Sequence, residues 1–202
     1  MMLTRTAIRA EYESSLGATA SRFTPEALDR HLDAAVQSLG YIAPLSRSDT
    51  LFLEPGTGVY PAPEDLIRPI SHTWGTTAQP WDTAYAGPRP RLLSTLEPDG
   101  PRLQISPVPT HRQVIQWGAE LHYRYVAGHR LTDSTSTIPL RFAGALRLRA
   151  QLEAMRELAA AGVTDPIQLH NGMGASMPAN TTPAGLMEAL RKAWQEEARH
   201  HV

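Results

Sequence analysis

The stretch HYRYVAGHRLTDSTSTIPLRFAGALRLRAQLEAM, from His122 to Met155, holds two different hydrophobic periods separated by a polar crossing. Before the crossing, apolar and polar residues alternate over QVIQWGAELHYRYVA (113–127), which is typical of a half-buried strand. Three residues share one face of this predicted strand: Leu121, Tyr123, Tyr125. After the crossing, apolar residues recur at spacings of three or four, which predicts an amphipathic helix: Phe142, Ala145, Leu148, Leu152, Met155, Ala159. The sequence therefore predicts a strand, a polar loop and then a long helix.

The ends of the predicted helices follow from capping residues. We expect Thr137, or a hydroxyl just before it, to cap the long helix, with Pro139 at or near the first turn. Gly162 should close this helix, which gives a range of about 139–161. An earlier helix should begin with Thr24 as cap and Pro25 in the first turn, bury Leu28, Leu32 and Val36, and stop at Gly40. A shorter helix over residues 3–16, ended by Gly17, should precede it.

The C-terminal part should contain one further helix. Its apolar stripe is formed by Leu186, Leu190 and Trp194, which predicts a helix at about 183–199. Between the two last helices, QLHNGMGASMPANTT (168–182) is small and polar. Such a segment buries too little apolar area to offset the ordering of the chain. We expect it to be poorly ordered in the free monomer and fixed by assembly.

The segment between Pro44 and Pro109 holds most of the seventeen prolines. Proline lacks a backbone donor, so this segment suits strand edges and turns rather than long helices. We expect a hairpin whose turn, 97–100, joins strands at 92–96 and 103–105. The predicted fold is therefore α+β: a helical bundle body from residues 1–49 and 129–202, with an antiparallel β-sheet and loop region inserted at 50–128.

Composition excludes several classes of function. The formal net charge of the 202 residues is −1, which gives no bulk attraction to a polyanion. No cysteine is present, so disulfides, thiolate metal sites and thiol catalysis are excluded. No apolar run approaches the ~20 residues of a membrane span, and the start of the chain lacks the apolar core of a signal peptide. We expect an intracellular protein that does not associate with membranes.

Histidine and serine residues do not form a recognisable catalytic or metal-binding motif. His122 and His129 occur without an HExxH pattern or carboxylates at ligand spacing. The chain has neither G-x-S-x-G nor a glycine-rich phosphate loop. A catalytic triad could be drawn from one loop, although residues so close in sequence rarely reach the required geometry: His129, Asp133, Ser134, Ser136. We expect no catalytic residue, no cofactor and no metal ion.

The predicted long helix carries arginines outside its apolar stripe. A solvated face with pairs such as Arg149–Glu153 would account for them. However, Leu140, Leu146 and Leu158 also lie off the stripe, and mixed arginine and apolar side chains suit a protein interface. The candidate subunit or portal interface therefore consists of these arginines and a tryptophan of the last helix: Arg141, Arg147, Arg149, Arg156, Trp194.

The order of these elements resembles the head-to-tail adaptor (connector) proteins of long-tailed bacteriophages and gene transfer agents. Four passages within Thr24–Gly162 carry the resemblance: LDRHLDAAVQSLGYIAP (28–44), YPAPEDLIRPISHTWG (60–75), LHYRYVAGHRLTDSTSTIP (121–139) and the alanine-rich helix LRFAGALRLRAQLEAMRELAAAG (140–162). The strand and loop segment is larger than in compact members, and the part after Gly162 carries no motif that matches the family.

The resemblance implies a structural protein without enzymatic activity. It implies a homo-oligomeric ring, commonly of twelve subunits, assembled in the cytoplasm of the host bacterium and bound beneath the portal protein in the virion neck. DNA would pass through the ring without sequence-specific binding. A stopper or tail-terminator protein, or the tail itself, would dock on the ring.

Two other functions are open at this point. Aromatic residues of the β-rich region could assemble an enzyme active site or a site for a carbohydrate or another small molecule: Trp74, Trp81, Tyr85, His111, Trp117. The chain could also be a different neck or tail component, such as a completion protein.

Overall fold

The computed structural model describes residues 3–75, 79–170 and 181–200. The chain divides into two compact units. The helical unit combines Met1–Pro44 with His129–Val202, and the β unit is Leu45–Gly128. The described part contains five α-helices and two three-stranded antiparallel sheets, which confirms the predicted α+β class.

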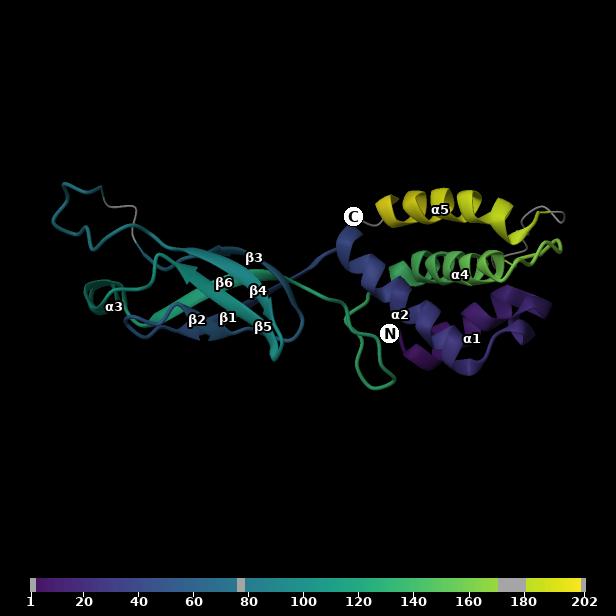
Figure 1. The fold of residues 1–202 in the computed structure, drawn as a ribbon, viewed down its shortest axis with the longest axis horizontal. Helices are drawn as coiled ribbons and strands as arrows, with labels where there is room; N and C mark the ends of the chain where they lie inside the picture. Colours follow the sequence, from purple (N-terminus) through teal and green to yellow (C-terminus); the bar gives the residue numbers. More distant parts are fainter. Residues whose placement is uncertain (1–2, 76–78, 171–180, 201–202) are drawn as a thin grey trace. The chain divides into compact units, whose positions relative to one another are not determined.

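The helical unit is built around one central helix. Figure 1 shows α4 between α5 on one side and α1 and α2 on the other. Two short 3₁₀ turns, Gly17–Arg22 and Leu140–Phe142, precede α2 and α4. The bounds of the four α-helices are as follows: α1 Arg5–Leu16, α2 Pro25–Ile42, α4 Ala143–Ala160, α5 Pro183–His200.

Local capping signals predicted most helix ends correctly. Thr24 accepts a hydrogen bond from the Ala27 N–H (3.3 Å) at the start of α2. Gly17 ends α1 with a positive φ of 56°, a conformation that favours glycine. The stop at Gly40 was wrong, because the helical ladder continues past it and the Ala43 N–H donates to the Leu39 carbonyl (2.8 Å).

The predicted start of the long helix was also wrong. Thr137 does not cap α4; its Oγ1 accepts from the Arg130 N–H (2.9 Å) and closes the polar loop on itself. With that hydroxyl engaged, Pro139 leads into the 3₁₀ turn and α4 begins at Ala143. Gly162, with φ 75°, follows the last residue of α4 closely, as predicted.

The core of the helical unit contains all seven residues predicted to be buried: Leu28, Leu32, Val36, Phe142, Leu148, Leu152, Met155. It also contains Leu146 and Leu158, which are only 1% and 5% exposed. The expectation that these two leucines lie on open faces was therefore wrong. Because α5 covers a second side of α4, this helix buries residues around most of its circumference.

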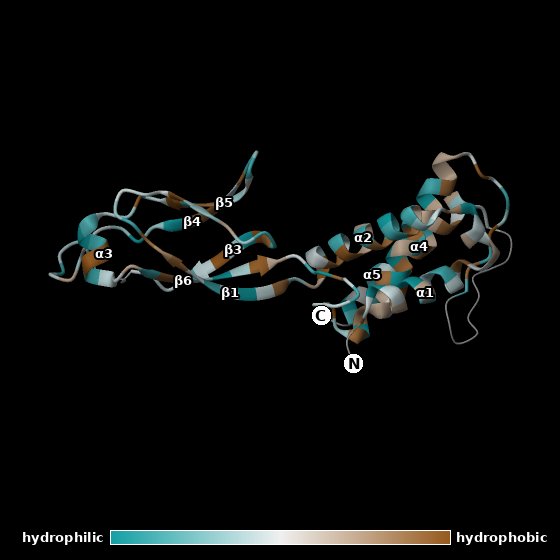
Figure 2. Ribbon diagram, turned by 90° about the horizontal axis from the view of Figure 1, so that it is seen from below, coloured by the Kyte–Doolittle hydropathy of each residue, from teal (hydrophilic) through white to brown (hydrophobic). Residues whose placement is uncertain are grey.

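The β unit contains two sheets with the strand orders β1-β6-β3 and β2-β5-β4. Figure 2 shows hydrophobic and hydrophilic bands along β1 and β3. The predicted hairpin is present as β4 and β5, with Glu97 opposite Gly100 at the turn. The strand bounds are as follows: β1 Leu45–Phe52, β2 Val59–Pro61, β3 Leu66–His72, β4 Arg91–Glu97, β5 Gly100–Ser106, β6 Glu120–Ala127.

The β unit has its own hydrophobic core. Leu121, Tyr123 and Tyr125 of β6 are buried, as the alternation predicted, together with Leu103 and Ile105 of β5. The alternation was extended too far towards the N-terminus, because residues 111–117 form a helix.

That helix, α3 (His111–Trp117), begins with a capping box. Thr110 accepts from the Gln113 N–H (3.3 Å), and the Gln113 amide oxygen accepts from the Thr110 N–H (2.9 Å). These reciprocal bonds favour a helical turn over a continued strand.

Two further expectations concern segments of the helical unit. The stretch predicted to be poorly ordered falls mainly on residues 171–180, which lie outside the described residues. At its described ends, Leu169 is buried and the Ile167 N–H donates to the Thr181 carbonyl (3.1 Å). Among the helices of the described ranges, none is long and apolar enough to cross a membrane.

Candidate functional site

Arg149 is held inside the helical unit. Its Nε donates to Ser38 Oγ (2.9 Å), and its Nη2 pairs with Glu153 (2.6 Å). The guanidinium carbon lies 5.2 Å from the centroid of the Trp194 ring. Arg149 therefore connects α2, α4 and α5. Its side chain is only 15% exposed, so it presents little charge to a partner.

The other candidate arginines differ in exposure. Arg156 is exposed and pairs with Glu153 (3.0 Å), so it shares a carboxylate with Arg149. Arg147 is half-buried. Arg141 is exposed, stacks on the Phe142 ring (5.2 Å) and adjoins Leu140, an apolar side chain that is 51% exposed.

The structure brings only three of the five candidate interface residues together. Arg149, Arg156 and Trp194 line a shallow groove of about 340 Å³ between α4 and α5, whose floor includes Leu152. Arg141 lies before the first turn of α4 and does not line the groove.

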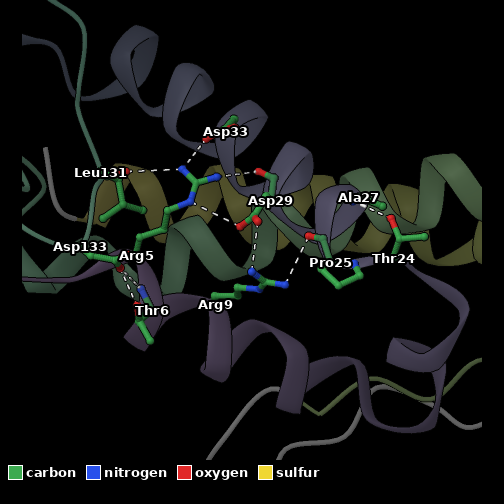
Figure 3. Close-up of polar contacts among 10 residues, drawn as sticks. All are labelled: Arg5, Thr6, Arg9, Thr24, Pro25, Ala27, Asp29, Asp33, Leu131 and Asp133. Carbon is green, nitrogen blue, oxygen red and sulfur yellow. Dashed lines mark hydrogen bonds and ion pairs between the residues drawn. The ribbon is translucent and has the colours of Figure 1, made fainter.

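A charge cluster that the sequence did not predict ties α1 to α2. Arg5 pairs with Asp33 (2.6 Å) and Asp29 (3.4 Å), and Arg9 pairs with the other Asp29 oxygen (3.1 Å), as Figure 3 shows. The hydrogen bond to Asp33 is the main cause that raises the pKa of Arg5. No local signal marks this cluster, because its partners lie twenty or more residues apart in the sequence.

The polar loop is fastened to the same end of α1. Asp133 Oδ1 accepts from both the hydroxyl (2.5 Å) and the N–H (2.9 Å) of Thr6. These two bonds, the hydroxyl first, lower the pKa of the Asp133 carboxyl. The loop is therefore a structural connection between α1 and the segment that leads into α4.

The residues of the possible triad have other partners. Asp133 binds Thr6, Ser136 Oγ accepts from the Ile138 N–H (3.2 Å), and His129 Nε2 donates to the Ala43 carbonyl (2.7 Å). In the β unit, exposed His122 lies 2.7 Å from Thr50 Oγ1. Within the described ranges, no three His, Asp or Glu side chains gather as a metal site would require.

A polar network runs from the core of the helical unit, at Tyr12 and His31, to a partly exposed carboxylate, Glu157. The Tyr12 hydroxyl lies 2.8 Å from His31 Nδ1, and His31 Nε2 lies 3.0 Å from Glu157 Oε2. Burial raises the pKa of Tyr12, whose side chain has no exposed surface. The order tyrosine, histidine, carboxylate is found in proton relays, but a substrate has no access to this hydroxyl. We therefore assign this polar network to packing specificity.

Two of the five aromatic residues proposed for a small-molecule site come together in the β unit. The Trp74 and Trp117 rings meet edge to face, with centroids 4.9 Å apart. They line an open cleft of about 740 Å³ that also includes Phe52, Glu120 and His122. The remaining aromatic residues do not line this cleft, and one of them, Trp81, is 80% exposed: Tyr85, His111, Trp81.

Comparisons with known proteins do not assign a family. No family model matches this chain, and a comparison with curated proteins finds no significant match.

Proposed function

We propose that this chain is a head-to-tail adaptor of a long-tailed bacteriophage or a gene transfer agent. Twelve copies would form a ring beneath the portal protein in the virion neck, extend the DNA channel, and dock a stopper or the tail. Its role would be structural, with DNA passing through without sequence-specific contact.

The observation that carries this proposal is the exposure of large apolar side chains on both units. On the helical unit these are Tyr41 and Leu140, and on the β unit they include Phe52, Leu96 and Ile115. Where such side chains adjoin one another or an arginine, they suit a surface that is covered by another protein. The adaptor resemblance of Thr24–Gly162 supplies the kind of assembly that would cover them.

The turn before α4 offers the best placed part of the candidate interface. Leu140 is half exposed, and Arg141 stacks on Phe142 with its charge in solvent. An exposed apolar residue beside an arginine is the composition typical of protein interfaces. Arg149 and Trp194 would support such an interface indirectly, because they hold α4 against α5.

The test combines the purified chain with the portal protein encoded in the same genome. We expect electron microscopy to show a twelvefold ring added to the portal. The double variant Leu140→Glu with Arg141→Glu should fold normally and lose at least ten-fold in portal binding. Arg112→Glu, an exposed charge reversal on α3, is the matched control and should bind like the wild type.

Two outcomes are separable. If the wild-type chain does not bind the portal or form a ring on it, the adaptor function is wrong. If the wild type binds and the double variant binds equally well, the adaptor function stands and the turn before α4 is not the interface.

A second function, carbohydrate or small-molecule binding, is favoured by one observation. Exposed Phe52 and half-buried Trp117, which packs on the buried Trp74, offer ring surface in one cleft. The hydrogen-bonding groups of Glu120 and His122 lie in the same cleft. Sugars bind to such combinations of aromatic faces and polar groups. A glycan array probed with the wild type and with Trp117→Ala separates the two functions, because only the binding module requires Trp117 for a signal.

A further inference from the structure

Strand β1 lies at the edge of its sheet. Its only strand partner in the described residues is β6, and Figure 2 shows it along the outer side of that sheet. The Leu53 N–H donates to the Ala119 carbonyl (2.8 Å). Since hydrogen-bonded pairs alternate along an antiparallel ladder, odd-numbered residues of β1 bond to β6. The backbone groups of Ser46, Ser48 and Thr50 therefore point away from the sheet.

The sequence of this edge strand is complementary to itself. Residues 45–51 read LSRSDTL, and Ser48 is the centre of the pattern. When a second copy is laid antiparallel with Ser48 opposite Ser48, Arg47 faces Asp49 twice and Leu45 faces Leu51 twice. In this register Ser48 forms a hydrogen-bonded pair, so Arg47 and Asp49 fall in the neighbouring non-hydrogen-bonded pairs. Side chains approach most closely in such pairs.

The two charges also discriminate against other registers. A shift of two residues places Arg47 opposite Arg47 or Asp49 opposite Asp49, and a parallel copy in register places like charges side by side. A shift of one residue turns every side chain of the added strand to the wrong face of the sheet. One antiparallel register is therefore favoured over its neighbours.

Both charged side chains are placed to take part. Arg47 is 42% exposed and pairs with Asp65 (2.7 Å), whose side chain is only 7% exposed. The arginine fork has donors for a second carboxylate. Asp49 is exposed; its Oδ1 accepts from the Thr50 N–H (2.8 Å) and its Oδ2 from the Tyr123 hydroxyl (3.2 Å). Each carboxylate oxygen has a second lone pair for Arg47 of a second copy, and the Thr50 N–H would exchange the Asp49 oxygen for the Ser46 carbonyl of that copy.

We propose that the free chain forms a symmetric dimer through β1. The two three-stranded sheets would join into one continuous sheet across a two-fold axis at Ser48. Opposite charges at equal distances from the axis specify a second copy of this chain as the partner. The dimer is a property of the free protein and does not rest on the adaptor function. If a ring also used β1 as a subunit contact, the dimer would have to open before that ring could form.

The first experiment is sedimentation of the full chain over a range of concentrations, together with disulfide trapping. We expect the mean mass to rise from one chain to two. Because the chain has no cysteine, Ser48→Cys introduces a single thiol at the axis. A hydrogen-bonded strand pair separates Cα atoms by about 5.5 Å, within disulfide range. We expect Ser48→Cys to cross-link, and Ser94→Cys, exposed on β4, to stay reduced.

The second experiment uses charge reversal. Asp49→Arg places an arginine opposite Arg47 at both symmetric positions, and Arg47→Asp likewise places an aspartate opposite Asp49. Each variant alone should dimerise at least ten-fold more weakly than the wild type, and an equimolar mixture should form a heterodimer. If Arg47→Asp does not fold because Asp65 loses its partner, Asp49→Arg alone gives the result.

A wild type that stays monomeric at every concentration overturns the proposal, as does an Asp49→Arg variant that dimerises like the wild type. These measurements contain no portal protein, so their failure is independent of the adaptor function.

Discussion

At the scale of single residues, Arg149 and Arg156 share Glu153 but differ in surroundings. Arg149 also bonds Ser38 and lies over Trp194, whereas Arg156 is exposed. We predict that Arg149→Met lowers the free energy of unfolding by about 2 kcal/mol, since it breaks a charged hydrogen bond in a poorly solvated place. Arg156→Met should change it by less than about 0.5 kcal/mol. Urea unfolding checks both, and equal effects would contradict this assignment.

Asp133 provides a pH-dependent contact at the same scale. Because Thr6 stabilises its carboxylate, the folded-state pKa is below the ordinary value of about 3.9. The contribution to stability is therefore complete above that value and is lost as the pH falls through the lowered pKa.

We predict that an NMR titration of Asp133 has its midpoint below the ordinary value, and that Thr6→Val moves it upward. This variant removes the hydroxyl and keeps the N–H bond. An unchanged midpoint would show that the hydroxyl does not hold the carboxylate.

At the scale of elements, α3 holds the loop at residues 79–90. Gln113, buried in the capping box, also donates to the Pro88 carbonyl (3.0 Å). We predict that Gln113→Ala speeds amide hydrogen exchange in the loop and α3 at least ten-fold, because it removes both connections at once. Exchange in the helical unit should not change. Arg112→Ala on the same helix is the control, and an equal response to it would contradict a specific role of Gln113.

Features of these elements that depend on local signals could be predicted from the sequence, whereas features that depend on tertiary packing could not. Thr24, Pro25 and Gly17 act within one helical turn, so their roles could be predicted from the sequence. The periodicity of α4 identified one buried stripe, but Leu146 and Leu158 are buried because α5 packs on a second side. Nothing local to α4 indicates that contact.

The same reason limited the candidate site. Arginine spacing on one helix does not show that Arg149 binds Ser38 and Trp194 on two other helices. Thr110 and Gln113, the two residues of the α3 capping box, are present in the sequence. The alternation of apolar and polar residues from 113 to 127 nevertheless favoured a strand, so the helix was not predicted.

At the scale of the whole molecule, two hydrophobic cores lie in different units. We predict that Leu152→Ala lowers the free energy of unfolding of the helical unit by ~2–5 kcal/mol, because it leaves a cavity in a buried helix. Leu103→Ala should do the same in the β unit. Hydrogen exchange measured by mass spectrometry should show each effect confined to its own unit. Equal acceleration in both units would mean that the chain unfolds as one cooperative block.

The first strand of the β unit and its last are neighbours in one ladder, with Leu45 opposite Ala127. The chain therefore enters and leaves this unit at adjacent points, about 5.5 Å apart between Cα atoms. Such a segment can be lost or exchanged as a unit during evolution. Recombination at its two borders would remove or replace it and leave the connections between the helices unchanged. Related genes should then vary most in length between these borders, while the sequence that encodes the helical unit changes by substitution alone.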